Sequence, residues 1–157
     1  MFEDINTYFT LEMIYLWLNI GIFPFWFVLF FFPKSKICKI LAISIFPFLI
    51  FCIIYCYLIY IFFHDNFNFL TSFNLYLGIH ELINLFSDTS FVILFWIHFL
   101  SINLFCGAWI VNDYQKISIS KIIIFIPLVI TYLMGPVGIV IYWIIKIFYT
   151  KRISLYE

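Results

Sequence analysis

Few side chains in this 157-residue sequence could carry out chemistry, and most of them lie in or beside one apolar stretch, Phe91–Val111. His98 is the one ionisable group well inside an apolar run, and Asp113 follows at the edge of the same run. A neutral imidazole offers one donor and one acceptor nitrogen, and a carboxylate accepts protons. We therefore take His98 and Asp113 as the candidate catalytic acid and base.

Each of these two residues also has a purely structural interpretation. His98 could form an interhelical hydrogen bond to Ser44, Thr131 or a backbone carbonyl. Haem or metal ligation by His98 is a further alternative, although a metal site requires several ligands that converge. Asp113 follows Asn112 at the membrane edge, where it could simply be the solvated end of a helix.

The same apolar run carries the candidate substrate-binding residues. At 100° per residue, one helix face would hold His98, Phe105 and Trp109, and another would hold Trp96, Asn103 and Gly107. We interpret Trp96, Phe105 and Trp109 as lining for a long apolar ligand. Asn103 is a further candidate for ligand contact, and its structural alternative is to hold two helices together. Gly107 would permit close helix approach.

The composition identifies a membrane protein. Charged residues make up only 10% of the chain and hydrophobic residues 66%, whereas soluble domains carry about 25% charged residues. The formal net charge is zero, so no basic surface for nucleic acid is expected. The four cysteines are scattered, which argues against a disulfide scaffold or a zinc site, and we expect no metal.

Four uncharged runs predict an all-α, single-domain bundle of four transmembrane helices over residues 1–157. About 20 helical residues cross a bilayer core of roughly 30 Å. The predicted spans are 14–32, 40–63, 91–111 and 122–145. Within residues 66–88 we expect an interfacial helix, with a disordered loop as the alternative.

The fourth run contains a distinctive Gly135-Pro136-Val137-Gly138 sequence. Pro136 removes a backbone donor and the flanking glycines allow a bend, so freed carbonyls near Tyr132 would need a partner or could bind a ligand hydroxyl. Pro136 is therefore another candidate binding residue. We favour one tilted crossing that is broken at Gly135-Pro136, and keep a re-entrant hairpin as the alternative.

Charge predicts the orientation. Lysines precede the second and fourth spans, whereas the N-terminal segment and the 64–90 connection contain no Lys or Arg. The positive-inside rule then places the N-terminus outside the cytoplasm, in a bacterial inner membrane or a thylakoid or plastid membrane. Four crossings would leave Lys146, Lys151 and Arg152 on the outer side, against that rule.

Two stretches in order resemble a known family. Residues 96–110, WIHFLSINLFCGAWI, followed by Asp113, are similar to the WxHxLxxDLFxGxWIxxD stretch of the abscisic acid-deficient four family. Pro127 and then residues 134–142, MGPVGIVIY, resemble that family's "P…FGPVGLLLY" ending. The resemblance covers about a third of the chain. One departure is Asn103, where the family usually has Asp.

The resemblance implies a small four-helix membrane protein with a carotenoid-related function. Plant members are associated with neoxanthin formation from violaxanthin, which implies a cofactor-independent isomerase of epoxycarotenoids. The alternative is a non-enzymatic pigment- or lipid-binding subunit, or an assembly partner of a membrane complex. The expected partners are membrane lipids and a carotenoid or other isoprenoid, and a homo-oligomer stays open. If the family's Asp were an essential acid or base, Asn103 would abolish the activity.

Overall fold

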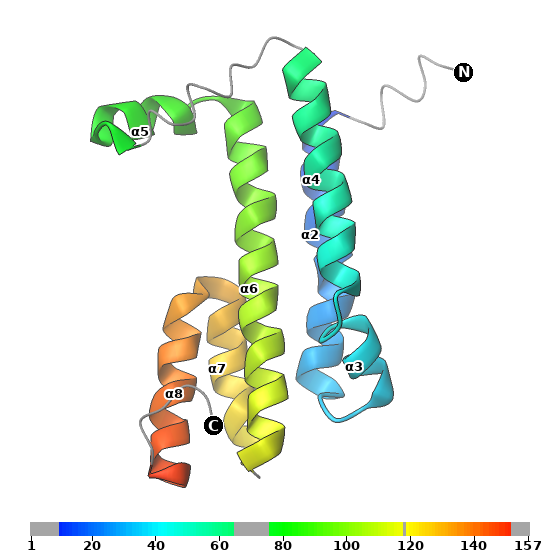
Figure 1. Ribbon diagram of the computed structural model, residues 1–157, viewed down its shortest axis with the longest axis vertical. Helices are drawn as coiled ribbons and strands as arrows, with labels where there is room; N and C mark the ends of the chain where they lie inside the picture. The colour runs from blue at the N-terminus through cyan, green and yellow to red at the C-terminus, as the bar shows by residue number, and fades with distance from the viewer. Residues whose placement is uncertain (1–9, 65–75, 118, 152–157) are drawn as a thin grey trace. The chain divides into compact units, whose positions relative to one another are not determined.

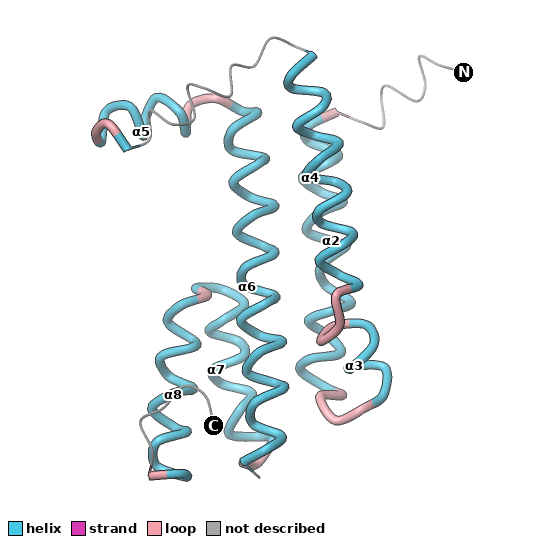
Figure 2. The backbone as a smooth tube through the Cα atoms, in the orientation of Figure 1, coloured by secondary structure: helices cyan, strands magenta, loops and turns pink. Residues whose placement is uncertain are grey.

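The computed structural model describes residues 10–64, 76–117 and 119–151 as helices joined by short turns (Figure 2). These residues contain no strand, so the all-α prediction is confirmed. The helices, labelled in Figure 1, are α2 (Leu11–Phe31), α3 (Lys36–Leu41), α4 (Phe46–His64), α5 (Ile79–Phe86), α6 (Thr89–Ile117), α7 (Lys121–Met134) and α8 (Pro136–Thr150).

Three helical segments are long and apolar enough to cross a membrane. They are Leu11–Phe31, Lys36–Phe62 and Thr89–Ile117, with 21, 27 and 29 residues. Large apolar side chains on them are exposed, as at Trp17 (61%) and Ile53 (68%), which in water would be unfavourable. The chain is therefore a membrane protein, as its composition predicts.

The predicted second span, 40–63, lies almost entirely within the apolar segment Lys36–Phe62 but is interrupted near its start. Helix α3 ends at Leu41, the chain turns, and α4 starts at Phe46. Ser35 caps α3, because its Oγ accepts a hydrogen bond from the Cys38 amide at 3.0 Å. Ser44 Oγ donates to the Ile40 carbonyl and accepts from the Phe46 amide at 3.1 Å. Serine bonds to the backbone thus create a turn inside an uncharged run.

The fourth apolar run forms a helical hairpin instead of one crossing. Helices α7 and α8 have 14 and 15 residues, pack against each other and run in opposite directions (Figure 1). At 1.5 Å per residue each is about 21 to 23 Å long, which is short of a bilayer core of roughly 30 Å. The predicted break at Gly135-Pro136 is confirmed, whereas a fourth crossing is not.

Two glycines allow the hairpin to close. Gly135 has a φ of 45°, a backbone conformation that disfavours any side chain, and Pro136 begins α8 directly after it. A Cβ on Gly138 would lie 2.0 Å from Thr131 Oγ1, so α7 and α8 approach each other there more closely than other residues permit. Thr131 Oγ1 in turn donates to the Pro127 carbonyl at 2.7 Å.

The chain forms two compact units, and α2, α4 and α6 contribute residues to both. The first unit comprises Met1–Gly21 and Leu49–Phe99, and its core includes Leu18, Leu58 and Ile97. Helix α5 belongs to this unit and lies within the predicted 66–88 segment, although residues 65–75 lie outside the described residues. Its interfacial placement stays a prediction.

The second unit comprises Ile22–Phe48 and Leu100–Glu157, and therefore includes α3, α7 and α8. Its buried side chains include Trp26, Leu104, Leu128 and Tyr142. A Cβ on Gly107 would lie 2.6 Å from Trp26 Cη2, so the indole of α2 packs directly on the α6 backbone. The close approach predicted at Gly107 is confirmed.

Candidate functional site

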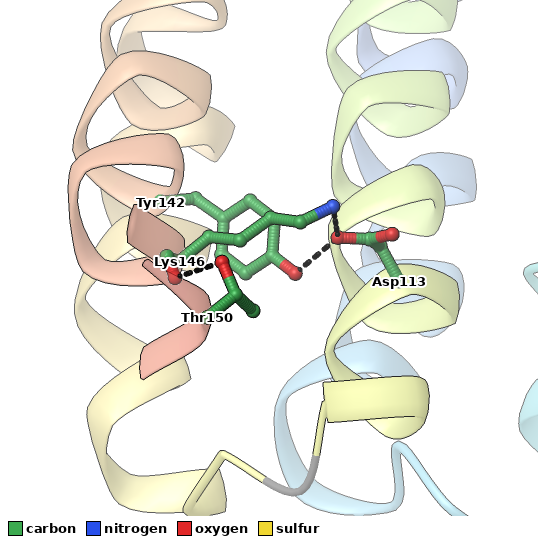
Figure 3. A network of polar contacts seen from close by, with 4 residues as sticks. All are labelled: Asp113, Tyr142, Lys146 and Thr150. Atoms are coloured by element: carbon green, nitrogen blue, oxygen red, sulfur yellow. Dashed lines mark hydrogen bonds and ion pairs between the residues drawn. The ribbon is translucent and has the colours of Figure 1, made fainter. Parts of the chain in front are cut away.

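A cluster of three polar side chains joins α6 to α8 within the second unit (Figure 3). Lys146 Nζ lies 2.8 Å from Asp113 Oδ2, and the Tyr142 hydroxyl donates a hydrogen bond to the same oxygen at 2.6 Å. We call Asp113, Tyr142 and Lys146 the polar cluster. In it, a phenol and an ammonium group both contact the same oxygen of one carboxylate.

The sequence of α8 places two of these groups on one helix face. Gly138, Tyr142 and Lys146 follow one another at four-residue intervals and are all buried. Residues four apart are neighbours on the helix surface. Thr150 extends the same face, and its Oγ1 donates to the Lys146 carbonyl at 2.9 Å. The face that begins with the close approach at Gly138 therefore ends in the polar cluster.

The polar cluster is almost fully buried. The side chains of Lys146 and Asp113 are 2% and 11% exposed, and Tyr142 is fully buried. A buried charge requires an opposite charge and hydrogen bonds to offset the loss of its hydration. The small exposed fraction of the cluster belongs to the Asp113 side chain.

An apolar groove lies beside the polar cluster, with Trp109 in contact with both. The Trp109 ring meets the Tyr142 ring edge-on, with centroids 5.6 Å apart and planes at 88°. On α6, Trp109 also helps to line a cavity of about 150 Å³, whose walls are Ile43, Phe48, Phe105, Ala108, Trp109 and Asn112. Phe105 meets Phe48 edge-on there, at 5.9 Å. Two predicted substrate-binding residues, Phe105 and Trp109, thus line one groove.

Asn103 contacts the hairpin turn instead of the groove. Its Nδ2 donates to the Tyr132 carbonyl at 3.5 Å, and a Cβ on Gly135 would lie 2.3 Å from its Oδ1. A freed carbonyl near Tyr132 was expected to need a partner, and the Asn103 amide supplies it. Because the bond needs an N–H donor, Asn suits this position better than an ionised Asp. Pro136 is exposed and fixes the first residue of α8.

His98 and Trp96 belong to the first unit, whereas Asp113 belongs to the second. His98 is exposed and precedes Asp113 by 15 residues on α6, about four helical turns. The structure therefore does not bring the proposed acid and base together. Trp96 stacks on Phe99 at 5.4 Å and lies 5.7 Å from Tyr15, and its buried Nε1 bonds to no group within the described ranges.

The suggested partners of His98 form other bonds. Ser44 bonds to the turn before α4, and Thr131 bonds to its own helix. Among the residues that the structure describes, no three His, Cys, Asp or Glu side chains gather in a way that could hold a metal ion. We therefore base the candidate chemistry of this protein on the polar cluster.

Sequence reasoning missed Lys146 and the role of Tyr142. It treated Lys146 as a flanking charge that reports topology, because Lys146 directly follows the uncharged run 122–145. The available signal was the spacing, since Tyr142 and Lys146 lie four residues apart in a predicted helix. Only the reversal at Gly135 brings that face to Asp113.

Comparison with known proteins gives one match. A family model described as ABA DEFICIENT 4-like matches residues 13–142, which include Asp113 and Tyr142 and end four residues before Lys146. No curated protein and no solved structure matches the chain.

Proposed function

The chain belongs to the ABA DEFICIENT 4-like family, and we propose that it binds an oxygenated isoprenoid, of the epoxycarotenoid type, within the membrane and isomerises it. The observation that carries this proposal is the junction of the polar cluster with the aromatic groove at Trp109. A polyene with an oxygenated end group needs an apolar surface and, at one end, groups that exchange protons. Both are present in the second unit.

The proposed reaction needs an acid and a base. Opening an epoxide requires a proton on the epoxide oxygen and the removal of a proton from a nearby carbon, and needs no change of redox state. We assign the first role to the Tyr142 hydroxyl and the second to the Asp113 carboxylate, which stand 2.6 Å apart. The proton then returns from Asp113 to the Tyr142 phenolate along the same hydrogen bond, which restores both groups.

Lys146 supports both groups through its charge. Its Nζ, 2.8 Å from Asp113 Oδ2, holds the carboxylate in place, and its positive charge would stabilise negative charge that forms on Tyr142. Lys146 is therefore a positioning residue, whereas Asp113 and Tyr142 act on the substrate.

A second candidate function is pigment or lipid binding without turnover, as a subunit or assembly partner of a membrane complex. It is favoured by the burial of Tyr142 and by the saturation of one carboxylate oxygen with two donors. Buried ion pairs of this kind also serve to fix a fold. In that case the groove would still hold an isoprenoid, but the polar cluster would only anchor α8.

The hairpin also supports a proposed orientation. With three crossings the two termini would lie on opposite sides, and the return of α8 would bring Lys151 to the same side as Lys34 and Lys116. The positive-inside rule makes that side cytoplasmic. We propose an N-terminus outside and a C-terminus inside.

The test is purification in mild detergent from a carotenoid-producing host, followed by an absorption spectrum and chromatography of the extracted pigment. The purified protein is then returned to lipid with violaxanthin. Stoichiometric pigment and a new isomer support the isomerase, and bound pigment without a new isomer supports the binding subunit. A colourless protein with no co-purifying isoprenoid would contradict the isomerase and the pigment-binding subunit, and would favour an assembly partner of a membrane complex.

A further inference from the structure

A second groove within the second unit combines an apolar wall with one charged side chain. Its volume is about 440 Å³, within the range of about 300 to 1,000 Å³ that is usual for sites of small molecules. The end of α2 and the start of α7 supply its lining, which is Phe30, Phe31, Lys121, Ile122, Phe125 and Ile126. We call it the Lys121 groove. It shares no lining residue with the groove beside Trp109 and includes no residue of the polar cluster.

Contacts between α2 and α7 form the wall of the Lys121 groove. The Phe125 ring lies 5.6 Å from the Phe30 ring and 6.5 Å from the Phe31 ring, measured between centroids. Lys121 Nζ donates a hydrogen bond to the carbonyl of Phe31, the last residue of α2. An ammonium group has three donor hydrogens, so two remain for a ligand. Among the residues that the structure describes, no carboxylate pairs with Lys121, and its positive charge is therefore available to an anion.

The charge stands at one end of the Lys121 groove. Lys121 is the first residue of α7, and Phe125 and Ile126 follow about one helical turn later. Ile122 and Ile126 are 81% and 60% exposed, so the apolar part of the groove is open to lipid chains. In the proposed orientation α7 starts at the cytoplasmic edge of the membrane and runs toward the bilayer interior. A ligand that matches this arrangement has an anionic head and an apolar tail.

We propose that the Lys121 groove binds one anionic phospholipid of the cytoplasmic leaflet. The lipid phosphate accepts a charge-assisted hydrogen bond from the Lys121 ammonium, and an acyl chain lies against Phe125 and Ile126. An anionic headgroup is attracted by the lysine more strongly than a zwitterionic one, because its net charge is not cancelled. The inference goes beyond the proposed function, since the proposed reaction uses neither Lys121 nor this groove.

The experiment measures lipid binding to the full chain in mild detergent by native mass spectrometry. The probes are phosphatidylglycerol and phosphatidylcholine with the same acyl chains, added in equal amounts. One lysine near the membrane surface corresponds to a preference of about fivefold for phosphatidylglycerol. Glycerol phosphate, which has the anion without the acyl chains, is expected not to displace the bound lipid. Displacement by glycerol phosphate would show a site for a soluble anion and overturn the proposal.

Variants of Lys121 test whether this groove is the site. Lys121→Gln is expected to abolish the preference for phosphatidylglycerol, and Lys121→Arg, which keeps the charge, is expected to retain it. The matched control is Lys39→Gln, since Lys39 on α3 is also exposed but does not line the groove. The proposal would be overturned by equal affinity of the unaltered protein for the two lipids, by a preference that survives in Lys121→Gln, or by an equal loss in Lys39→Gln. None of these results would alter the proposed function.

Discussion

Lys146 and Asp113, 33 residues apart in the sequence, form a buried ion pair with Nζ 2.8 Å from Oδ2. The pair joins the last turns of α8 to α6 within the second unit. Because the Tyr142 hydroxyl bonds to the same oxygen, the pair both anchors the hairpin and supplies the groups of the proposed reaction.

Breaking this ion pair should destabilise the protein strongly. Lys146→Met leaves the Asp113 carboxylate buried without its counter-charge, which typically costs about 3 to 5 kcal/mol. The measurement is the unfolding free energy in detergent, from titration with a denaturing detergent. The double variant Asp113→Asn with Lys146→Met removes both charges and should recover most of the lost stability. A Lys146→Met variant as stable as the unaltered protein would contradict this role.

The hairpin turn should not tolerate a side chain at Gly135. Gly135→Ala forces a strained φ of 45° and sets a Cβ 2.3 Å from Asn103 Oδ1, so we expect a loss of about 1 to 3 kcal/mol. The matched control is Gly21→Ala in α2, where nothing lies within 4 Å of the added Cβ. That substitution should be neutral or stabilising by up to about 1 kcal/mol. If thermal unfolding showed equal effects for the two substitutions, Gly135 would not have the special conformation that this turn requires.

The orientation can be tested with reporter proteins. Since α7 and α8 are each too short to cross, a reporter fused after Glu157 should lie on the same side as one inserted after Lys36. Green fluorescent protein and alkaline phosphatase fusions in a bacterial host distinguish the two sides. Reporters on opposite sides would show that the fourth apolar run crosses the membrane after all.

The candidate role of His98 can be tested independently of the polar cluster. If Asp113 and Tyr142 supply both proton transfers, His98→Ala should change the turnover of violaxanthin by less than about tenfold, whereas loss of a catalytic acid or base costs 10²- to 10⁴-fold. The His98 side chain is exposed, so the variant should also fold normally. A drop of a hundredfold or more with unchanged stability would restore His98 as a catalytic residue.

Composition and run length were sufficient to predict an all-helical membrane protein. The motif order was sufficient to predict the family, and Pro136 with its glycines located the break. The outcome of that break was beyond sequence reasoning, because run length favoured one kinked crossing whereas charge favoured a hairpin. The choice depends on the φ of Gly135 and on the fit of Gly138 against Thr131, which are tertiary contacts.

The candidate site was predicted only in part, because several of its contacts also depend on the hairpin. Asp113, Phe105 and Trp109 share α6, so helical spacing could relate them. Lys146 and Tyr142 reach Asp113 only after α8 folds back, and His98 was paired with Asp113 because both lie near one apolar run. Asn103 was recognised as a polar residue that needs a partner, but its partner in the hairpin turn depends on that same reversal.

The most direct test of the central claim compares Tyr142→Phe with the unaltered protein in lipid vesicles that contain violaxanthin. The substitution removes one hydroxyl oxygen and keeps the ring that packs against Trp109, so folding and pigment binding should persist. We predict that the rate of isomer formation, followed by chromatography, falls at least about a hundredfold. An unchanged rate in Tyr142→Phe would contradict the assignment of the chemistry to the polar cluster.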